Sequence, residues 1–262
     1  MNLSTEEKER YSRQTIVTGV GEQGQLKLKQ AKILVIGMGG LGSPIAYYLT
    51  AAGIGTLGLA DGDHVDRSNL QRQLLHSTSD LGKSKVISAW ETLRDLNPNV
   101  KFNIIDSRMH VDNILETIQE YDFIVDGTDS FASKYLVNDA CVLANKPYVH
   151  GSVLRLDGQM ITVKPHETAC YRCIYEEPPP PGIVPTPSQA GVLSSTPGII
   201  GSMQATEALK YILGTGELLT NQLAIVDAGS MQFRNVKVKR NKNCPLCGDH
   251  PSITSLHDRA YN

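Results

Sequence analysis

The first 150 residues repeat one pattern, in which a short apolar run precedes a longer segment with apolar positions at helical spacing. Runs at 33–36, 56–61, 100–105 and 122–126 predict strands, and a further strand begins at 147–150. Segments near 45–52, 83–96, 111–120 and 131–145 predict helices, as do shorter stretches within 5–31. Because strand and helix alternate, we expect an α/β fold with a Rossmann-like, doubly wound sheet that is parallel in this half.

The pattern changes after residue 150. Hairpin-like segments are predicted near 153–163 and at 223–239, with a helix at 199–213, so the sheet should be mixed in the C-terminal half. Residues 176–197 contain seven prolines, too many for regular structure, and they predict a mobile surface loop.

Composition limits the kinds of partner that the protein can have. The net charge is -2 and the sequence pI is about 6.4, so no global basic field attracts nucleic acid. The N-terminus is polar, and no apolar run approaches the ~18 residues of a membrane helix. We therefore expect a soluble, cytoplasmic protein without a membrane partner. Its five cysteines then point to a metal or to catalysis before disulfides.

A glycine-rich turn follows the first predicted strand. Gly37, Gly39 and Gly42 match the pattern G-x-G-x-x-G between a strand and a helix, and Asp61 ends the next strand. Glycines allow close backbone approach, the helix N-terminus offers N–H groups to phosphate, and the carboxylate can accept from ribose hydroxyls. The turn predicts a nucleotide site. On this motif alone, an NAD(P)-dependent oxidoreductase is the natural alternative.

Charged residues follow the carboxyl ends of two predicted strands. Arg72 and Lys85 come after the second strand, and Asp129 lies in the loop after the strand at 122–126. Ligands of open α/β sheets bind at this edge, so these groups should converge with the glycine turn. Two cations and a spare carboxylate suit a triphosphate with Mg²⁺ better than the pyrophosphate of a dinucleotide.

Two C-x-x-C pairs are widely separated along the chain. Cys170 and Cys173 form one, and Cys244 and Cys247 form the other. Four thiolates fit one tetrahedral Zn²⁺ and leave no open position, so we predict a structural zinc site that joins the C-terminal tail to the domain body. The alternative is two redox pairs or free thiols. Cys141 lies in an apolar helical stretch and is expected in the core.

Taken in order, these features resemble the ThiF/MoeB/HesA family, the bacterial relatives of ubiquitin-activating enzymes. The shared motifs run from about residue 10 to 248: RYSRQ at 10–14, the glycine turn, Asp61, SNLQRQ at 68–73, Lys85, DGTD at 126–129 and the two cysteine pairs. The resemblance implies one adenylation domain over 1–262. Its nucleotide-binding half would be about 1–150, and its carrier-binding and zinc half about 151–250.

The resemblance also implies an activity. A homodimeric adenylyltransferase would use ATP to adenylate the C-terminal glycine carboxylate of a small ubiquitin-like sulfur-carrier protein that ends in Gly-Gly. Pyrophosphate would be released, and the carrier would be ThiS- or MoaD-like, serving sulfur transfer to thiamine thiazole or molybdopterin. Because this carboxylate is already ionised at pH 7, its attack on the α-phosphorus needs no general base.

Individual positions take roles from the same resemblance. Asp129 would bind Mg²⁺, and Arg13 would reach the phosphates of ATP bound to the neighbouring subunit. Catalysis would rest on Arg13, Arg72, Lys85 and Asp129. The residues expected to contact ATP are Gly37, Gly39, Gly40, Gly42, Asp61, Ser68, Asn69, Leu70, Gln71, Arg72, Lys85, Asp129 and Ser130.

The proline-rich loop departs from the family pattern. Many relatives carry a cysteine just before the segment that matches 190–192 and use it for covalent sulfur or thioester chemistry, whereas Pro187 stands there in this chain. We therefore expect the acyl-adenylate to pass to a separate sulfur donor such as a cysteine desulfurase.

Three alternatives to carrier adenylation differ in what they would bind. An NAD(P)-dependent oxidoreductase leaves Arg72, Lys85 and Asp129 unexplained, and a tRNA-modifying relative conflicts with the acidic balance. A non-catalytic scaffold would not need the phosphate-binding charges. The seven histidines show no metal spacing and are expected at the surface or at strand ends, and His150 is a candidate for lining a channel for the carrier tail.

Overall fold

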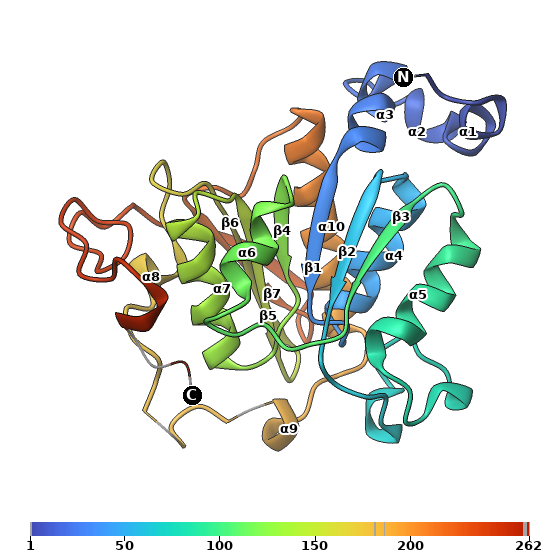
Figure 1. Cartoon of the computed structure of the whole chain (residues 1–262). Helices are drawn as coiled ribbons and strands as arrows, with labels where there is room; N and C mark the ends of the chain where they lie inside the picture. The colour runs from blue at the N-terminus through green and yellow to red at the C-terminus, as the bar shows by residue number, and fades with distance from the viewer. Residues whose placement is uncertain (1, 181, 186, 259–260, 262) are drawn as a thin grey trace.

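The computed structural model describes residues 2–180, 182–185, 187–258 and 261. One eight-stranded sheet runs through the molecule in the order β3-β2-β1-β4-β5-β6-β7-β8 (Figure 1). Its strands are β1 (Lys32–Ile36), β2 (Thr56–Ala60), β3 (Lys101–Ile105), β4 (Phe123–Asp126), β5 (Tyr148–Leu154), β6 (Asp157–Val163), β7 (Gln222–Asp227) and β8 (Gln232–Lys237). The pairings from β3 to β5 are parallel and those from β5 to β8 are antiparallel, which confirms a mixed α/β sheet.

Helices cover both faces of the sheet. One face packs against α4 (Gly42–Ala52), α5 (Lys85–Leu96) and α10 (Thr196–Leu213), and the other against α6 (Ile114–Gln119) and α7 (Phe131–Leu143). The shorter helices are α1 (Thr5–Arg10), α2 (Ser12–Thr15), α3 (Gly21–Gln30), α8 (Tyr171–Ile174), α9 (Pro187–Ala190), and the 3-10 turns η1 (Arg67–Asn69), η2 (Thr78–Asp80) and η3 (Leu256–Asp258). None of the helices in the described part of the chain is both long enough and apolar enough to cross a membrane.

Strand β1 shows why its sequence is continuously apolar. Ile33 and Val35 belong to the core cluster under α4 and α10, whereas Leu34 and Ile36 belong to the cluster under α6 and α7. Successive side chains of a strand point to opposite faces, so a strand covered on both sides needs apolar residues at every position.

The connections that follow β1 and β4 create the space for a ligand site. These two strands are neighbours, but β1 leads into α4 on one face and β4 leads into α7 on the other. The two connections therefore diverge at the carboxyl ends of the strands and leave a crevice between them. In open α/β sheets this switch point is the usual ligand site.

The proline-rich segment 176–197 differs from its prediction. Residues Pro187–Ala190 form the short helix α9, and the backbones of Arg155 and Val192 pair as a parallel bridge. Helix α10 begins at Thr196, three residues before the predicted start at 199, because Pro197 is tolerated in a first helical turn, where its missing N–H has no intrahelical partner. The expectation of no regular structure is therefore wrong for these parts. Positions 181 and 186 lie outside the described residues, and the mobility of the loop stays a prediction.

Candidate functional site

The glycine turn is shaped by two close backbone contacts. Gly37 has a φ of +93°, and a Cβ there would lie 2.8 Å from the carbonyl oxygen of Gly127. A Cβ on Gly42 would lie 1.9 Å from the carbonyl oxygen of Gly37. Both positions therefore require glycine, which lets β1, β4 and the first turn of α4 meet closely. The turn presents the N-terminus of α4 to the crevice, where helix N–H groups favour phosphate.

Asp61 and His76 contact the two backbone polar groups of Met38 in the turn. The Asp61 carboxylate accepts from the backbone N–H groups of Met38 at 2.7 Å and Asp63 at 2.8 Å. The His76 Nε2 lies 3.0 Å from the Met38 carbonyl oxygen, and its Nδ1 lies 2.8 Å from the Ser88 hydroxyl. His76 is buried, contrary to the expectation of a surface histidine, and burial lowers its pKa. Asp61 thus shapes the glycine turn as well as lining the crevice.

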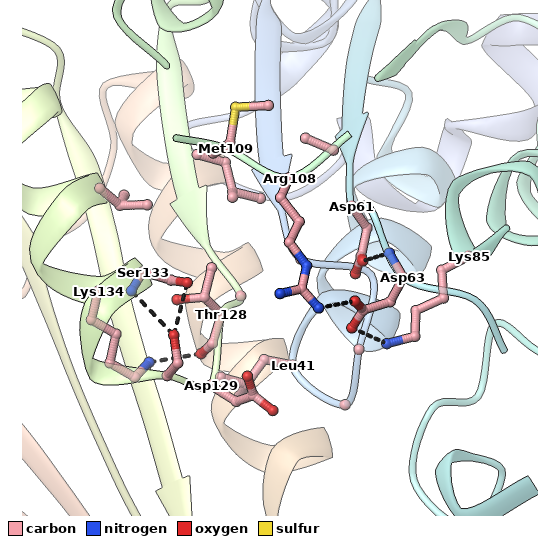
Figure 2. Close-up of a pocket in the computed structure, with 18 of the residues that line it drawn as sticks. Leu41, Asp61, Asp63, Lys85, Arg108, Met109, Thr128, Asp129, Ser133 and Lys134 are labelled. Carbon is pink, nitrogen blue, oxygen red and sulfur yellow. Dashed lines mark hydrogen bonds and ion pairs between the residues drawn. The ribbon is translucent and has the colours of Figure 1, made fainter. Parts of the chain in front are cut away.

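A second carboxylate, Asp63, is shared by two cations. The Lys85 Nζ lies 3.1 Å from Asp63 Oδ2, and the Arg108 Nη2 lies 2.6 Å from Asp63 Oδ1 (Figure 2). Burial raises the pKa of the Asp63 carboxyl, but hydrogen bonds from Arg108 and Lys85 outweigh it, so the pKa lies below its usual value. Asp63 therefore orients the ammonium of Lys85, which is almost fully buried at the start of α5.

The loop after β4 places Asp129 at the crevice. Asp129 is exposed, and its carboxylate accepts no hydrogen bond from any residue in the described part of the chain. Ser130 caps α7 by accepting from the Ser133 N–H at 3.1 Å. A carboxylate that accepts no hydrogen bond from the described residues, next to a phosphate-type turn, fits the hard oxygen ligand that Mg²⁺ prefers.

These groups line one cavity of about 390 Å³. Eight of the predicted site residues line it: Gly37, Gly39, Gly40, Asp61, Arg72, Lys85, Asp129 and Ser130. Gly42 lies just behind the turn, and the segment Ser68, Asn69, Leu70 and Gln71 is outside the lining, as is Arg13. Their contacts with a nucleotide stay predictions.

The segment before Arg72 still has a clear structural role. Asp66 accepts from the Ser68 N–H at 2.8 Å, Asn69 accepts from the Asp66 N–H at 3.3 Å, and the Arg72 guanidinium donates to the Ser68 carbonyl at 3.1 Å. This turn fixes the stem from which Arg72 reaches the cavity.

Several lining residues were missed from the sequence. They include Leu41, Asp63, Gln73, Arg108, Met109, Ser133 and Lys134. Gln73 ends the motif SNLQRQ, and Asp63 and Arg108 follow the carboxyl ends of β2 and β3, so the order of the strands held a signal for all three. Gln73 is buried, and its Oε1 has no partner among the described residues, which leaves an acceptor for a ligand. Lys134 lies inside α7 and carried no signal.

His150 does not line the cavity. It lies on β5, fully buried, with Nδ1 2.8 Å from the Asp126 carboxylate. The suggestion that it faces a channel for the carrier tail is therefore wrong, because the pleat of β5 turns its side chain into the core under α7 and α8.

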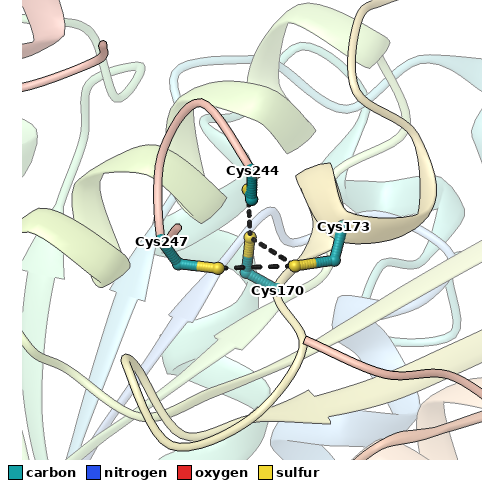
Figure 3. Close-up of side chains that lie close together, drawn as sticks. All are labelled: Cys170, Cys173, Cys244 and Cys247. Atoms are coloured by element: carbon teal, nitrogen blue, oxygen red, sulfur yellow. Dashed lines mark hydrogen bonds between the residues drawn. The ribbon is translucent and has the colours of Figure 1, made fainter. Parts of the chain in front are cut away.

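The four paired cysteines converge (Figure 3). Sγ–Sγ distances are 3.9 Å for Cys170–Cys173, 3.7 Å for Cys170–Cys244 and 3.4 Å for Cys173–Cys247. A tetrahedral zinc site requires about 3.8 Å and a disulfide about 2.05 Å, so the cluster is positioned to bind one metal ion. Hydrogen bonds among the four thiols lower the pKa of Cys173 and Cys244 and raise the pKa of Cys170 and Cys247. Cys141 is buried in the core, as expected.

The fold and the cavity together define a nucleotide-binding α/β domain, with four cysteines at its C-terminal side that are positioned to bind one metal ion. The model of the ThiF family matches residues 11–246, and the chain belongs to this family.

Individual relatives support this membership. Over 264 residues the chain is 44% identical to the sulfur carrier protein adenylyltransferase of Thermus thermophilus, covering 98% of this chain and 97% of that protein. It is 45% identical over 257 residues to the adenylyltransferase and sulfurtransferase MOCS3 of Culex quinquefasciatus, of which it spans 59%. The crystal structure of E. coli MccB with MccA-N7isoASN is similar with a TM-score of 0.80 at 25% identity, over 94% of this chain and 75% of that one.

Proposed function

We propose that the protein adenylates the C-terminal carboxylate of a sulfur-carrier protein with ATP. One observation carries the proposal: the glycine turn, Arg72, Lys85 and Asp129 line the same cavity at the switch point of the sheet. The similarity over nearly the full length of the Thermus thermophilus enzyme supports this substrate class. A nicotinamide dinucleotide would leave the two cations and Asp129 without a role.

The chain's own groups supply what the reaction needs. The carrier carboxylate forms a new O–P bond at the α-phosphorus, the bond to the bridging oxygen breaks, and pyrophosphate leaves with both bonding electrons. No proton has to move, because the carboxylate is ionised at pH 7. Catalysis is therefore positioning and neutralisation of charge, with the glycine turn holding phosphate and Arg72 and Lys85 facing the leaving group.

Two metals are part of the proposal. Mg²⁺ would be held by Asp129 and the phosphates, and would neutralise charge on the triphosphate. Zn²⁺ would be held by the four cysteines and would take no part in the reaction, because four protein ligands leave no open position.

The C-terminal half is proposed to bind the carrier. We expect the carrier to be a ThiS- or MoaD-like protein ending in Gly-Gly that approaches residues 151–250. With Pro187 in the loop, the enzyme's chemistry ends at the acyl-adenylate, and a separate donor such as a cysteine desulfurase provides sulfur. A thiol-sensitive covalent bond between enzyme and carrier would contradict that end point.

Exchange of labelled pyrophosphate into ATP tests the activity. We expect exchange only with a purified ThiS- or MoaD-like carrier, and none with a carrier that lacks its terminal glycine. Arg72→Ala and Asp129→Ala should each reduce exchange at least ~100-fold without unfolding the protein. The absence of exchange with every carrier would remove the proposal, and the carrier that does support exchange identifies the pathway.

The active form is proposed to be a homodimer. Arg13 lies exposed on α2, at the opposite end of β1 from the cavity, so it serves its own site poorly (Figure 1). Ile16 and Val17 beside it are 74% and 53% exposed, a feature typical of a partner-binding surface.

Mixing two inactive variants tests this dimer. In a mixed dimer of Arg13→Ala and Arg72→Ala chains, one site is intact and the other carries both changes. Random exchange of subunits should therefore restore roughly a quarter of wild-type exchange activity. If Arg13 acts within its own chain, mixing restores nothing.

A further inference from the structure

A buried chain of contacts joins the first cysteine pair to the loop that carries Asp129. The His150 ring on β5 packs against the Tyr171 ring, with 4.4 Å between the ring centroids. Tyr171 stands directly after Cys170 and is itself buried. On its other side, His150 places Nδ1 2.8 Å from Asp126 Oδ2, where β4 ends. No part of the activity proposed above uses His150 or Tyr171.

Asp126 connects His150 to the loop backbone. Its Oδ1 accepts from the Thr128 N–H at 3.0 Å and from the Thr128 hydroxyl at 2.7 Å. The carboxylate therefore bridges β5 on one side and the loop on the other. Both side chains of the Asp126–His150 pair are at most 1% exposed, so water cannot replace a lost bond without opening the core.

Two more buried side chains donate hydrogen bonds to the backbone of the same loop. The Gln204 Nε2 on α10 donates to the Asp126 carbonyl at 2.8 Å. The Lys134 Nζ on α7 donates to the carbonyl oxygens of Thr128 at 2.7 Å and Gly151 at 2.8 Å. Backbone from Asp126 to Thr128 is thus fixed by three elements, and Asp129 is the next residue.

Asp129 depends on this support more than its neighbours do. Lys85 is oriented by Asp63, and Arg72 by the Ser68 carbonyl. The Asp129 carboxylate, in contrast, accepts no hydrogen bond from the described residues. Arg108 and Lys134 act on it only through their charge, so the backbone of its loop is what fixes its position.

We propose that His150 is a positioning residue for Asp129, acting through its Nδ1–H bond to Asp126 and held in place by Tyr171. The geometry requires the proton on Nδ1, because Nε2 has no partner among the described residues while Nδ1 faces a carboxylate. The inference rests on the proposed role of Asp129 in binding Mg²⁺.

Two substitutions separate this role from packing. In His150→Asn the amide nitrogen lies where Nδ1 lies, so the bond to Asp126 can form. In His150→Gln the amide lies one bond further out, near the position of Nε2, and that bond is lost. Both variants are polar, and glutamine is the closer in volume to histidine. Tyr171→Phe keeps the ring that packs on His150 and serves as the matched control.

The measurement is the Mg²⁺ concentration that half-saturates binding of a non-hydrolysable ATP analogue, followed by calorimetry. Loss of a residue that orients a metal ligand typically weakens the metal about 10–100-fold, so His150→Gln should raise this concentration at least ~10-fold. His150→Asn and Tyr171→Phe should stay within about threefold of wild type. Analogue binding without Mg²⁺ should be the same in all four proteins.

The proposal is wrong if His150→Gln and His150→Asn need the same Mg²⁺ concentration for half-saturation. This comparison requires that both variants keep the zinc content and the thermal unfolding temperature of the wild type. If His150→Gln does not fold, His150→Phe takes its place, because it keeps a ring against Tyr171 and removes the bond to Asp126. An unchanged Mg²⁺ requirement in that variant also refutes the proposal. Because analogue binding needs no carrier, a failure of carrier-dependent exchange would count against the proposed function and leave this result intact.

Discussion

At the scale of single residues, Gly37 and Gly42 set the shape of the nucleotide turn by lacking side chains. Gly39, in contrast, would place a Cβ no closer than 3.5 Å to any atom, the nearest being Nε2 of Gln73. Neighbouring backbone atoms therefore exclude a side chain at Gly37 and Gly42, whereas there is room for one at Gly39. The difference lies in what approaches each backbone position.

This difference predicts opposite outcomes for two alanine substitutions. Gly42→Ala places a methyl group 1.9 Å from the Gly37 carbonyl oxygen and should destabilise the fold by about 1–3 kcal/mol while abolishing ATP binding. Gly39→Ala should leave the free energy of unfolding within about 0.5 kcal/mol of wild type. Urea unfolding and ATP calorimetry measure both. Equal destabilisation by the two variants would contradict the assigned contacts.

Asp80 predicts a pH dependence of stability. It accepts from Lys83 Nζ at 2.8 Å and from the N–H and hydroxyl of Ser77 at 2.9 and 2.8 Å. Burial raises the pKa of the Asp80 carboxyl, but these hydrogen bonds outweigh it and hold the pKa far below its usual value. A carboxyl with a depressed folded-state pKa stabilises above its unfolded pKa of about 3.9, and this stabilisation is lost as the pH falls toward the folded value.

Asp80→Asn should therefore lower the free energy of unfolding by about 1–3 kcal/mol at pH 7. The gap between variant and wild type should narrow below about pH 4. Urea midpoints at pH 7 and at the lowest pH where both proteins stay folded check this. A gap that is constant with pH would show that the charge of Asp80 is irrelevant.

At the scale of elements, one buried ion pair joins α7, α8 and the C-terminal tail. Arg172, between the cysteines of the first pair, donates to both oxygens of Asp139 on α7 at 2.8 Å each. The Tyr261 hydroxyl also donates to Asp139 at 2.6 Å, and Arg172 donates to the Glu176 carbonyl at 2.7 Å. The pair thus fastens the start of the proline-rich segment and the end of the chain to the same helix.

Asp139→Leu should destabilise the protein by about 3–5 kcal/mol, because Arg172 would remain buried without its counter-charge. The double variant Asp139→Leu with Arg172→Met should be more stable than the single one, since it leaves no uncompensated buried charge. Chemical denaturation of the three proteins measures this order. A double variant that is less stable than Asp139→Leu would mean that Arg172 is stabilised by its other partners, the Glu176 carbonyl and the Glu177 carboxylate 3.8 Å away.

At the scale of the whole molecule, the cysteine cluster ties the tail after β8 to the body of the domain. Two hydrogen bonds from the tail also support the cluster. The Asn241 N–H lies 3.3 Å from Cys173 Sγ, and the Arg240 guanidinium donates to the Cys247 carbonyl at 2.6 Å. Such contacts order a site once the metal has gathered its ligands.

We expect about one zinc ion per chain, measured by elemental analysis of the purified protein. Cys244→Ser should lose that zinc and expose residues 241–258 to proteolysis, and chelation of the wild type should do the same. Cys141→Ala, which changes a buried cysteine that is not one of the four converging thiols, should keep the zinc. A full complement of zinc in Cys244→Ser would place the metal elsewhere.

The sequence alone determined the fold class, the phosphate-type turn and the four cysteines that converge in the structure. Each is a local signal: apolar runs buried on two faces, glycines between a strand and a helix, and cysteines at metal-ligand spacing. The order of strands and loops also predicts that Arg72, Lys85 and Asp129 lie at one edge of the sheet, where they line the same cavity.

Only the tertiary structure decided how these groups are held. Arg108 binds Asp63, which lies 45 residues away in the sequence, and Gln204 donates to the Asp126 carbonyl, 78 residues away. The His150 side chain lies in the core and not in the cavity. Polar contacts of this kind leave no periodic trace in a sequence, because a hydrogen bond depends on where two distant segments pack. Local sequence motifs therefore determine which chemical groups the site contains. Their geometry depends on the packing of β4, β5, α7 and α10 around one loop.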